Sequence, residues 1–200
     1  MRIISGSLKG RQLHVPPEAK LRPTTDRVRT SLFDSLEQLT DFSECVAVDL
    51  YSGSGSLGFE AISRGVRECF FVEQARVLVR YLNETASALG VFDRAAVLPG
   101  EVLKVLPRLA ERLSDRQQRI GDFVRLILAD PPYTAHPGFN LLRELLRSGV
   151  VAAPTVVAIG RPRQLVEPGH ETWPGALTPR PTEIKTKSFG DTQFDIYIFT

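Results

Sequence analysis

The stretch VAVDLYSGSGSLGFE, residues 46–60, joins a short apolar run to a glycine-rich turn and then to an amphipathic segment. The apolar run, residues 46–50, predicts a strand that is buried on both faces of a parallel sheet. Gly53, Gly55 and Gly58 follow it in a G-x-G-x-x-G pattern. A ligand can approach the backbone N–H groups of such a turn closely, because no β-carbon obstructs it. The stretch therefore predicts a ligand-binding turn between a strand and a helix.

Strand and helix patterns alternate along most of the chain around this turn. Strands are predicted at residues 46–50, 69–73, 95–99, 124–130 and 155–160, and helices at residues 24–40, 56–65, 75–90, 101–112 and 138–149. Such alternation implies right-handed crossovers and a doubly wound parallel sheet with both faces covered, an α/β fold. Residues 182–200 alternate on both sides of Gly190 and Asp191, which predicts an antiparallel hairpin at the sheet edge.

The first 23 residues are expected to stand apart from this α/β unit. Residues 2–15 predict a β-hairpin with a loose loop, and the three prolines within residues 16–23 predict a linker. We therefore divide the chain into a basic hairpin and linker, residues 1–23, and an α/β domain, residues 24–200. Residues 161–181 contain five prolines and two glycines, so no long helix is expected there.

Charge is distributed unevenly along the chain, whose formal net charge is only +2. Residues 1–30 carry seven Lys and Arg against two acidic residues, a local net charge of +5. A basic end on a near-neutral body suggests contact with a polyanion, although a solvated basic surface is the alternative for each side chain alone. The candidate phosphate contacts are Arg2, Lys9, Arg11, Arg22, Arg27 and Arg29.

Composition places the chain among ordinary globular proteins. No apolar run reaches the length of a membrane span, and the first residues lack the apolar core of a secretory signal. Cys45 and Cys69 fall next to or within predicted strands, which favours buried reduced thiols in a cytoplasmic protein. The three histidines share no metal-ligand spacing, so no metal site is expected.

Two carboxylates suggest what the glycine turn binds. Glu73 ends the second predicted strand twenty residues after Gly53, where it can accept hydrogen bonds from both hydroxyls of a ribose. Asp49 lies at the end of the first strand, where it would repel the pyrophosphate of a nicotinamide dinucleotide. The same acid would attract the amino group and the sulfonium of S-adenosylmethionine. The pattern thus favours S-adenosylmethionine, with a dinucleotide as the alternative.

Several motifs together resemble one family. DLYSGSGSLG, residues 49–58, resembles motif I of class I S-adenosylmethionine-dependent methyltransferases. DPPY, residues 130–133, resembles the motif of those that methylate exocyclic amines of nucleobases. RIISGSLKGRQL (2–13), LRPTTDRVRTSLFDSL (21–36) and KSFGDTQFDIYIF (187–199) resemble segments of the bacterial RsmD family, the 16S rRNA guanine-N2 methyltransferases.

The resemblance implies a Rossmann-like fold with a seven-stranded, mostly parallel sheet that ends in the antiparallel hairpin. It also implies methylation of N2 of one guanine in small-subunit rRNA, within an assembled or assembling 30S subunit, by an enzyme that we expect to be a monomer. Glu101 stands where the family tends to carry Asp or Asn near the adenine amino group. The cofactor-binding candidates are Asp49, Tyr51, Gly53, Gly55, Gly58, Glu73, Glu101, Val102 and Asp130.

The DPPY segment, Asp130, Pro131, Pro132 and Tyr133, suits methylation of an amine that is a poor nucleophile. The lone pair of a guanine exocyclic nitrogen is delocalised, so the site must turn this nitrogen toward sp3 geometry. The Asp130 carboxylate and the Pro131 carbonyl can accept its two N–H groups, because the prolines fix the local backbone. Tyr133 offers a face for base stacking. The alternative is that the DPPY segment is a loop that ends the strand and has no catalytic role.

Three other functions stay open at this point. An adenine-N6 methyltransferase acting on DNA or RNA would use the same tetrapeptide, and guanine is favoured by resemblance alone. A nicotinamide-dependent oxidoreductase would use the glycine turn, and a non-catalytic RNA-binding factor would use the basic segment. A base within a helix cannot reach such a pocket, and the chain has no spare domain for reading sequence. A structured RNA, recognised by shape, is therefore the expected substrate.

Overall fold

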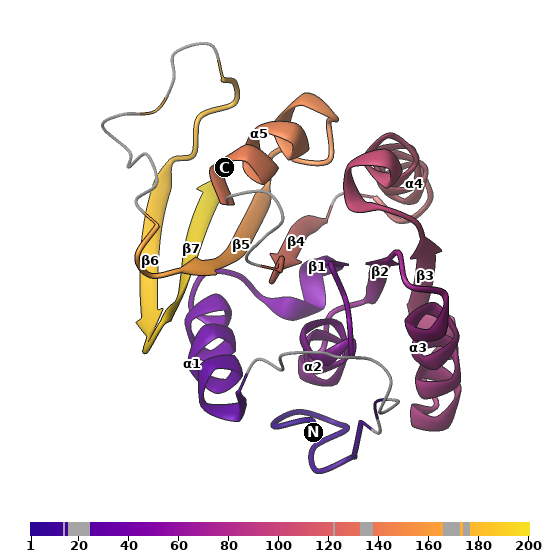
Figure 1. The fold of residues 1–200 in the computed structure, drawn as a ribbon. Coiled ribbons are helices and arrows are strands. Elements are labelled where there is room, and N and C mark those ends of the chain that lie inside the picture. The colour runs from indigo at the N-terminus through magenta and orange to yellow at the C-terminus, as the bar shows by residue number, and fades with distance from the viewer. Residues whose placement is uncertain (14, 16–24, 122, 133–137, 166–172, 174–176) are drawn as a thin grey trace.

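The structure is a computed structural model that describes residues 1–13, 15, 25–121, 123–132, 138–165, 173 and 177–200. Figure 1 shows one central sheet with helices on both faces. The strands are β1 (Cys45–Leu50), β2 (Glu68–Glu73), β3 (Ala95–Pro99), β4 (Val124–Ala129), β5 (Thr155–Pro162), β6 (Glu183–Phe189) and β7 (Thr192–Phe199). The helices are α1 (Asp26–Glu37), α2 (Ser56–Arg64), α3 (Arg76–Leu89), α4 (Val102–Ile120) and α5 (Gly138–Arg147). None of these helices is long and apolar enough to cross a membrane.

The seven strands form one sheet in the order β3-β2-β1-β4-β5-β7-β6. β1 to β5 run parallel, and β7 pairs antiparallel with both β5 and β6. The strand order reverses between β1 and β4, so the crevice that receives ligands in doubly wound sheets lies at the carboxyl ends of these two strands. The predicted Rossmann-like α/β fold and its closing hairpin are confirmed.

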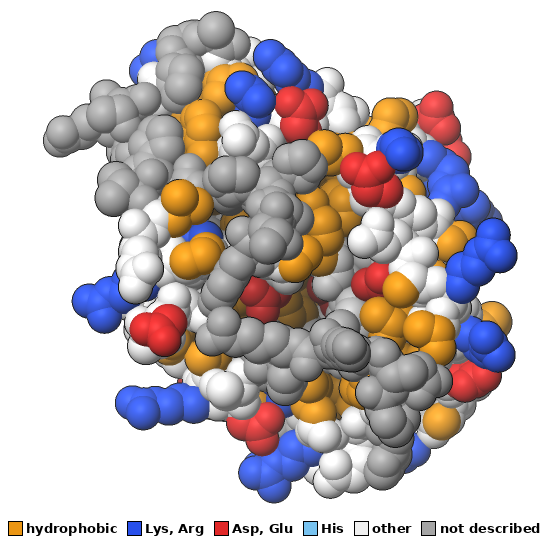
Figure 2. Space-filling model, in the orientation of Figure 1, with side chains coloured by type: hydrophobic (Ala, Val, Ile, Leu, Met, Phe, Trp, Pro, Cys, Tyr) orange, Lys and Arg blue, Asp and Glu red, His pale blue; other side chains and the backbone are white. Residues whose placement is uncertain are grey.

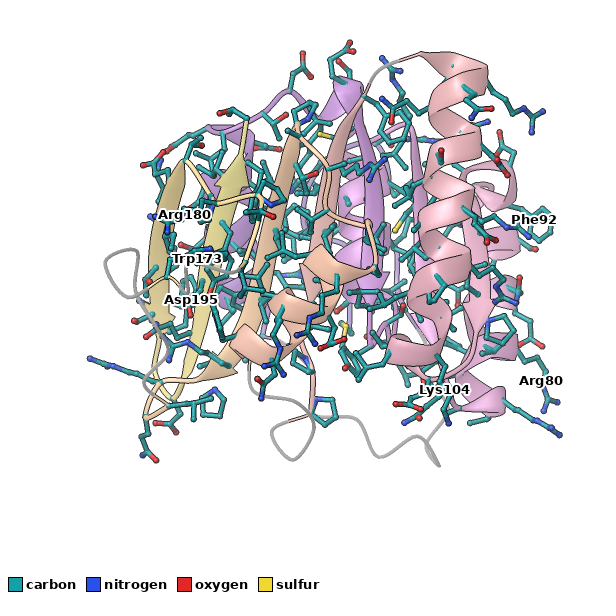
Figure 3. The ribbon with its side chains drawn as sticks, turned by 90° about the horizontal axis from the view of Figure 1, so that it is seen from above. Arg80, Phe92, Lys104, Trp173, Arg180 and Asp195 are labelled. Carbon is teal, nitrogen blue, oxygen red and sulfur yellow. The ribbon has the colours of Figure 1, made fainter. Side chains whose placement is uncertain are left out.

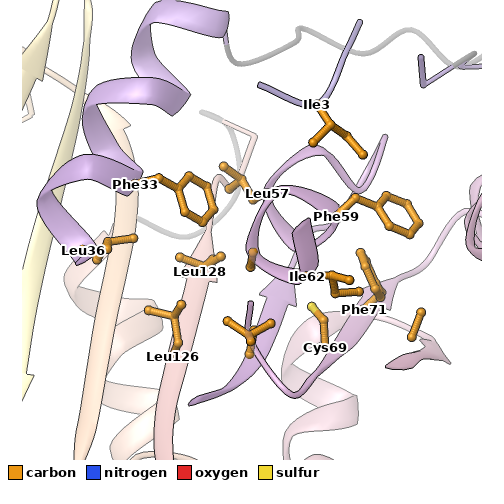
Figure 4. Packing of buried hydrophobic residues seen from close by; sticks show 14 of the residues in the cluster. Ile3, Phe33, Leu36, Leu57, Phe59, Ile62, Cys69, Phe71, Leu126 and Leu128 are labelled. Carbon is orange, nitrogen blue, oxygen red and sulfur yellow. The ribbon is translucent and has the colours of Figure 1, made fainter. Parts of the chain in front are cut away.

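Two apolar layers hold the sheet between the helices. α1, α2 and α3 cover one face and α4 and α5 the other (Figure 1), and β1 is buried at all six of its residues. Figure 4 shows the first layer, in which Phe59 of α2 packs on Phe71 of β2 with ring centroids 4.7 Å apart. Cys45 and Cys69 are buried free thiols, as predicted. This packing fixes the carboxyl ends of β1 and β2 and hence the loops that follow them.

The N-terminal segment turns back on itself, but it does not form the two predicted strands. Arg2 and Gln12 make an isolated antiparallel bridge outside the named strands. The neighbouring N–H groups are directed at α2, where the buried Glu60 carboxylate accepts from the N–H groups of Ile4 at 2.7 Å and Ser5 at 3.1 Å. A longer ladder cannot form because these donors already have partners in the helix.

Helix α4 continues to Ile120, eight residues beyond the predicted end at Arg112. The last turns of this helix are rich in polar residues, so their sequence carries little of the apolar periodicity that indicates a helix. Leu109 and Leu113 carry the apolar stripe forward and are fully buried, and Arg116 pairs with Glu68 at the start of β2. Packing against the sheet therefore stabilises turns whose own sequence signal is weak.

Trp173 packs at the end of the sheet that β6 and β7 form. Its side chain is 7% exposed, and its indole N–H donates to the Leu177 carbonyl at 3.0 Å. Phe139 of α5 meets the ring edge-to-face at a centroid distance of 5.6 Å. Figure 3 shows Trp173 and Asp195 at the β6–β7 end of the sheet, away from Phe92 at the other end. Trp173 thus belongs to the apolar layer that α4 and α5 form on the sheet.

Candidate active site

A cavity of about 980 Å³ opens at the carboxyl-terminal edge of the sheet. Its walls come from the segments after β1, β2, β3 and β4, from the amino end of α1 and from the turn between β6 and β7. In Figure 2 the hollow near the middle of this face shows acidic and apolar side chains, and Lys and Arg side chains lie nearer the outline. The cavity thus lies at the reversal of strand order, where α/β folds bind ligands.

The glycine turn after β1 is held in a backbone conformation that suits close approach. Tyr51 and Gly53 have φ values of 57° and 54°, and a positive φ at a non-glycine residue often marks a functional turn. Ser52 ties the turn to both strands, because its N–H donates to the Val72 carbonyl and its hydroxyl to the Asp49 carbonyl at 2.6 Å. Tyr51 and Gly53 both line the cavity, as their predicted role requires.

Glu73 connects the turn to the end of β2. One of its carboxylate oxygens accepts from the Gly53 N–H at 2.9 Å, and the other accepts from the Ala75 N–H at 2.8 Å. The side chain is 8% exposed and lines the cavity. Each oxygen keeps a further acceptor site. The carboxylate is therefore fixed in place with capacity left for the two hydroxyls of a ribose.

Asp49 is the most deeply buried acid of the cavity, with 1% of the residue exposed. It accepts from the Gly58 N–H at 2.9 Å. Burial raises the pKa of Asp49 well above its ordinary value, and the negative charges of Asp130 and Glu73 raise it further. A cationic ligand would reverse this effect, because it favours the ionised carboxylate. The cavity is thus suited to a ligand that carries both a ribose and a positive group.

Gly55 and Gly58 are required for packing around the turn. Neither lines the cavity. A β-carbon at Gly58 would lie 2.3 Å from the ring of Phe71, and one at Gly55 would lie 2.6 Å from Leu82 and Phe59. The two glycines let α2 pack closely against β2 and α3, which is the usual task of the third glycine in this pattern. They position the turn, and their predicted contact with the cofactor stays a prediction.

The segment after β3 forms a further wall. Glu101 and Val102 both line the cavity, and their contact with a cofactor stays a prediction. The backbone N–H of Gly100 donates to the Glu73 carbonyl at 2.9 Å, which fixes the start of this segment. The Glu101 carboxylate pairs with Lys104 at 3.0 Å in a half-exposed setting, while Val102 is almost fully buried. Val102 therefore supplies an apolar wall, and Glu101 a carboxylate at the rim.

The DPPY segment opens into the same cavity. Asp130, Pro131 and Pro132 directly follow β4 and line it beside the glycine turn. Pro131 is buried and Pro132 exposed. Tyr133 lies outside the described residues. A carboxylate and a rigid carbonyl thus stand at the carboxyl end of β4, across the strand reversal from the turn after β1.

Four of the predicted phosphate contacts are exposed: Arg2, Lys9, Arg11 and Arg27. Arg2 pairs with Asp26 at 3.3 Å, and Arg11 donates to the Ala88 carbonyl at 2.8 Å. Arg27, in the first turn of α1, lines the cavity itself. A chain that enters the cavity would therefore pass beside this guanidinium.

The prediction for Arg29 is wrong. Its side chain is fully buried and donates to the Arg2 carbonyl at 2.8 Å and to the Asp26 carboxylate at 2.7 Å. It holds the N-terminal segment on α1 and has no surface to offer a phosphate. Arg22, the remaining candidate, lies outside the described residues.

Two walls of the cavity were missed in the sequence. One is the start of α1, with Thr25 and Val28, and the other is the β6–β7 turn, residues 188–192. The position of the turn follows from topology, because β7 runs antiparallel to β5 and pairs Thr192 with Pro162 at the carboxyl edge. The predicted edge hairpin would have placed the turn there if β5 had been recognised as its neighbour.

Comparison with known proteins gives the family. The sequence model of the family described as conserved hypothetical protein 95 matches residues 1–198. Ribosomal RNA small subunit methyltransferase D of Haemophilus influenzae is 42% identical over 147 residues, which are 73% of this chain and 68% of that protein. The protein of the same name from Escherichia coli is 40% identical over 89 residues, 44% of each chain. The match thus spans less than half the length of the Escherichia coli relative.

Solved structures share the fold over most or all of the chain. A hypothetical protein of Thermus thermophilus has a TM-score of 0.75 and 27% identity, and the match covers 100% of this chain and 99% of that one. An RNA methyltransferase from Salinibacter ruber, in complex with S-adenosyl-L-homocysteine, has a TM-score of 0.59 and 16% identity over 86% of this chain and 93% of its own. At that identity the likeness concerns the fold alone. Because the family model spans nearly the whole sequence, the chain belongs to the conserved hypothetical protein 95 family and is an RsmD-like S-adenosylmethionine-dependent methyltransferase.

Proposed function

We propose that this chain transfers the methyl group of S-adenosylmethionine to the exocyclic N2 of one guanine in small-subunit rRNA. The observation that carries the proposal is the meeting of two motifs in one cavity. Asp130 and Pro131 at the end of β4 face the same space as Asp49 and Glu73 at the ends of β1 and β2. An amine acceptor pair and a cofactor cradle thus share one site.

The residues of the cradle match the chemical groups of the cofactor. Bound there, S-adenosylmethionine supplies a methyl group activated by its sulfonium. Glu73 would hold the ribose hydroxyls, and Asp49 would balance positive charge near the glycine turn. Val102 would pack on the adenine, and Glu101 would lie near its amino group. These contacts fix the cofactor at one end of the cavity and leave the other end for the base.

Asp130 and Pro131 would prepare the amine. Their carboxylate and carbonyl oxygens accept the two N–H groups of the guanine amine and hold them out of the ring plane. The nitrogen lone pair is then freed from the ring and directed at the methyl group. Positioning and stabilisation of the developing positive charge would supply most of the rate. The proton leaves afterwards to Asp130 or to water, and Tyr133 remains the predicted stacking partner.

The substrate follows from the relatives and from the surface. The curated relatives from Haemophilus influenzae and Escherichia coli are ribosomal RNA small subunit methyltransferases, and we infer the same class of RNA here. The exposed cations Arg2, Lys9 and Arg27 suit contact with an RNA backbone, and Arg27 lies at the cavity itself. We infer that a cytoplasmic monomer acts on an assembling 30S subunit, and that the target base is a guanine flipped from its stack.

The decisive experiment is incubation of the protein with unmodified small subunits and S-adenosylmethionine labelled in the methyl group. Mass spectrometry of the digested rRNA should find N2-methylguanosine at one nucleotide. Asp130→Ala should lower the rate by about 100-fold or more, because it removes an acceptor that orients the amine. Asp115→Ala, at an exposed position on α4, is the matched control and should leave the rate unchanged. Absence of transfer, or a methyl group on adenosine, would overturn the proposal.

A further inference from the structure

Gly160 of β5 stands next to Asp130 at the carboxyl edge of the sheet. β4 and β5 pair in parallel register as far as Ala129 and Ile159, so the next residue of each strand lies side by side. Gly160 is buried, and its φ is not in the left-handed region. Backbone conformation therefore does not require a glycine here, and a glycine inside a strand weakens it. A close approach by another group is the remaining physical reason.

The group that approaches is the Asp130 carboxylate. A β-carbon at position 160 would lie 2.7 Å from Oδ1 of Asp130, closer than real β-carbons come to any neighbour. The same β-carbon would lie 3.1 Å from Cζ of Phe194. Phe194 of β7 is the direct partner of Gly160 in the antiparallel pairing of β5 with β7, and it is fully buried. Its ring is fixed by the core, so the carboxylate would have to move.

We propose that Gly160 is a positioning residue for methyl transfer. The missing side chain leaves the space that the Asp130 carboxylate occupies, and the ring of Phe194 also borders that space. The carboxylate is thereby aimed into the cavity, where it accepts from the amine. This inference rests on the proposed function and deepens it, because it assigns the orientation of the acceptor to a residue that contacts neither substrate nor cofactor.

The first test is Gly160→Ala. The added methyl group turns the carboxylate away, so kcat should fall by about 10- to 100-fold while KM for the small subunit stays within about threefold. Val157→Ala is the matched control, because Val157 is a buried residue of the same strand whose side chain packs in the other apolar layer. It should lower the melting temperature and leave kcat within about twofold. Wild-type kcat in Gly160→Ala would overturn the inference.

A double-mutant cycle separates positioning from a general effect on the fold. In the Asp130→Ala background the methyl group at position 160 has no carboxylate to displace. Gly160→Ala should then change the residual rate by less than about twofold. Any melting temperature lost in Gly160→Ala should also be regained in the double variant, because the crowded oxygen is gone. An equal loss of rate in both backgrounds, or no regain of stability, would overturn the inference.

Total methyl incorporation into RNA should be counted alongside the identity of the modified base. If the wild-type protein transfers no methyl group to small subunits, the proposed function fails. If it transfers methyl groups and Gly160→Ala does so equally well, only the role of Gly160 fails.

Discussion

At the scale of single residues, ionised Asp49 destabilises the unliganded fold. Its carboxylate is buried, and its pKa is raised mainly by desolvation and further by Asp130 and Glu73. The folded, unliganded protein therefore binds more protons than the unfolded chain above the ordinary Asp pKa of about 3.9. The free energy of unfolding contributed by this group falls as pH rises from there through the folded pKa.

Asp49→Asn should remove this penalty. Above the folded pKa of Asp49 the unliganded variant should be more stable than the wild type by about 1–2 kcal/mol, the usual scale of stability gained by relieving an active-site residue. Well below the ordinary Asp pKa of about 3.9 the difference should vanish, since Asp49 is then protonated in both the folded and the unfolded state. Cofactor affinity should fall by about tenfold or more, because a charge partner is lost. Melting curves over pH, with and without S-adenosylhomocysteine, measure both effects. Equal pH dependence in the two proteins would contradict this account.

Arg27 and Arg29 lie two residues apart on α1 and should behave in opposite ways. Arg27 is exposed at the cavity and Arg29 is fully buried. Arg27→Ala should keep the melting temperature and lower RNA affinity, with the salt slope of binding reduced by about 1. Arg29→Ala should lower the free energy of unfolding by about 2–4 kcal/mol, because it leaves a cavity and frees the Arg2 carbonyl. Filter binding at several salt concentrations and thermal melts distinguish the two. A stable Arg29→Ala protein would refute the buried role.

At the scale of elements, α2 carries the N-terminal segment as well as the glycine turn. Glu60 accepts from the backbone of Ile4 and Ser5 and pairs with Arg64. Ser63 adds further contacts. The Ser7 N–H donates to its carbonyl at 2.8 Å, and the Leu8 N–H donates to its hydroxyl at 2.9 Å. Residues 4–8 are thus tied to α2, the helix that follows the glycine turn. RNA contacted there would be held in fixed relation to the cavity.

Glu60→Ala should release this segment. The partly buried N–H groups of residues 4 and 5 would lose their acceptor, and Arg64 its buried partner, at a cost of about 2–4 kcal/mol in unfolding free energy. Amide hydrogen exchange over residues 3–8 should rise well above that of α3. Glu84→Ala, at an exposed position on α3, is the control and should change neither quantity. Unchanged exchange in Glu60→Ala would mean that the other contacts suffice.

Element prediction succeeded where the pattern is local. The parallel strands and the helices between them follow from short apolar runs and glycine stops, such as Gly65 and Gly90, both in left-handed conformations at helix ends. The end of α4 and the docking of the N-terminal residues on α2 could not be predicted, because both depend on distant partners. Leu113 is buried by the sheet, and the first residues give their N–H groups to Glu60.

At the scale of the whole molecule, cofactor binding should act as a ligand-linked stabilisation of the single sheet. S-adenosylhomocysteine at about 100 times its Kd adds about 2.7 kcal/mol to the free energy of unfolding. For a chain of 200 residues this should raise the melting temperature by about 5–10 °C. NADH at the same concentration should have no effect, since its pyrophosphate would face Asp49. Differential scanning fluorimetry makes the comparison, and stabilisation by NADH alone would reverse the assignment.

The candidate site residues that lie within sequence motifs could be predicted, and those outside the motifs could not. Asp49, Glu73 and Asp130 were found because each ends a strand at the same edge. Arg29 was misplaced because charge alone does not show whether a side chain is buried. The β6–β7 turn was missed because its contribution depends on the pairing of β7 with β5, which no local pattern encodes.

The strand at one end of the sheet order, β6, carries charged side chains along its length. Glu183, Lys185 and Lys187 alternate along it, and the first two form an ion pair at 3.3 Å. A strand from a second molecule that tried to extend the sheet would have to desolvate these charges, and natural proteins use charged edges of this kind to block such growth. Fibril formation from this edge is therefore disfavoured by the same hairpin that closes the cavity. Replacing Lys185 and Lys187 with valine, in order to stabilise the strand, would therefore favour aggregation through this edge.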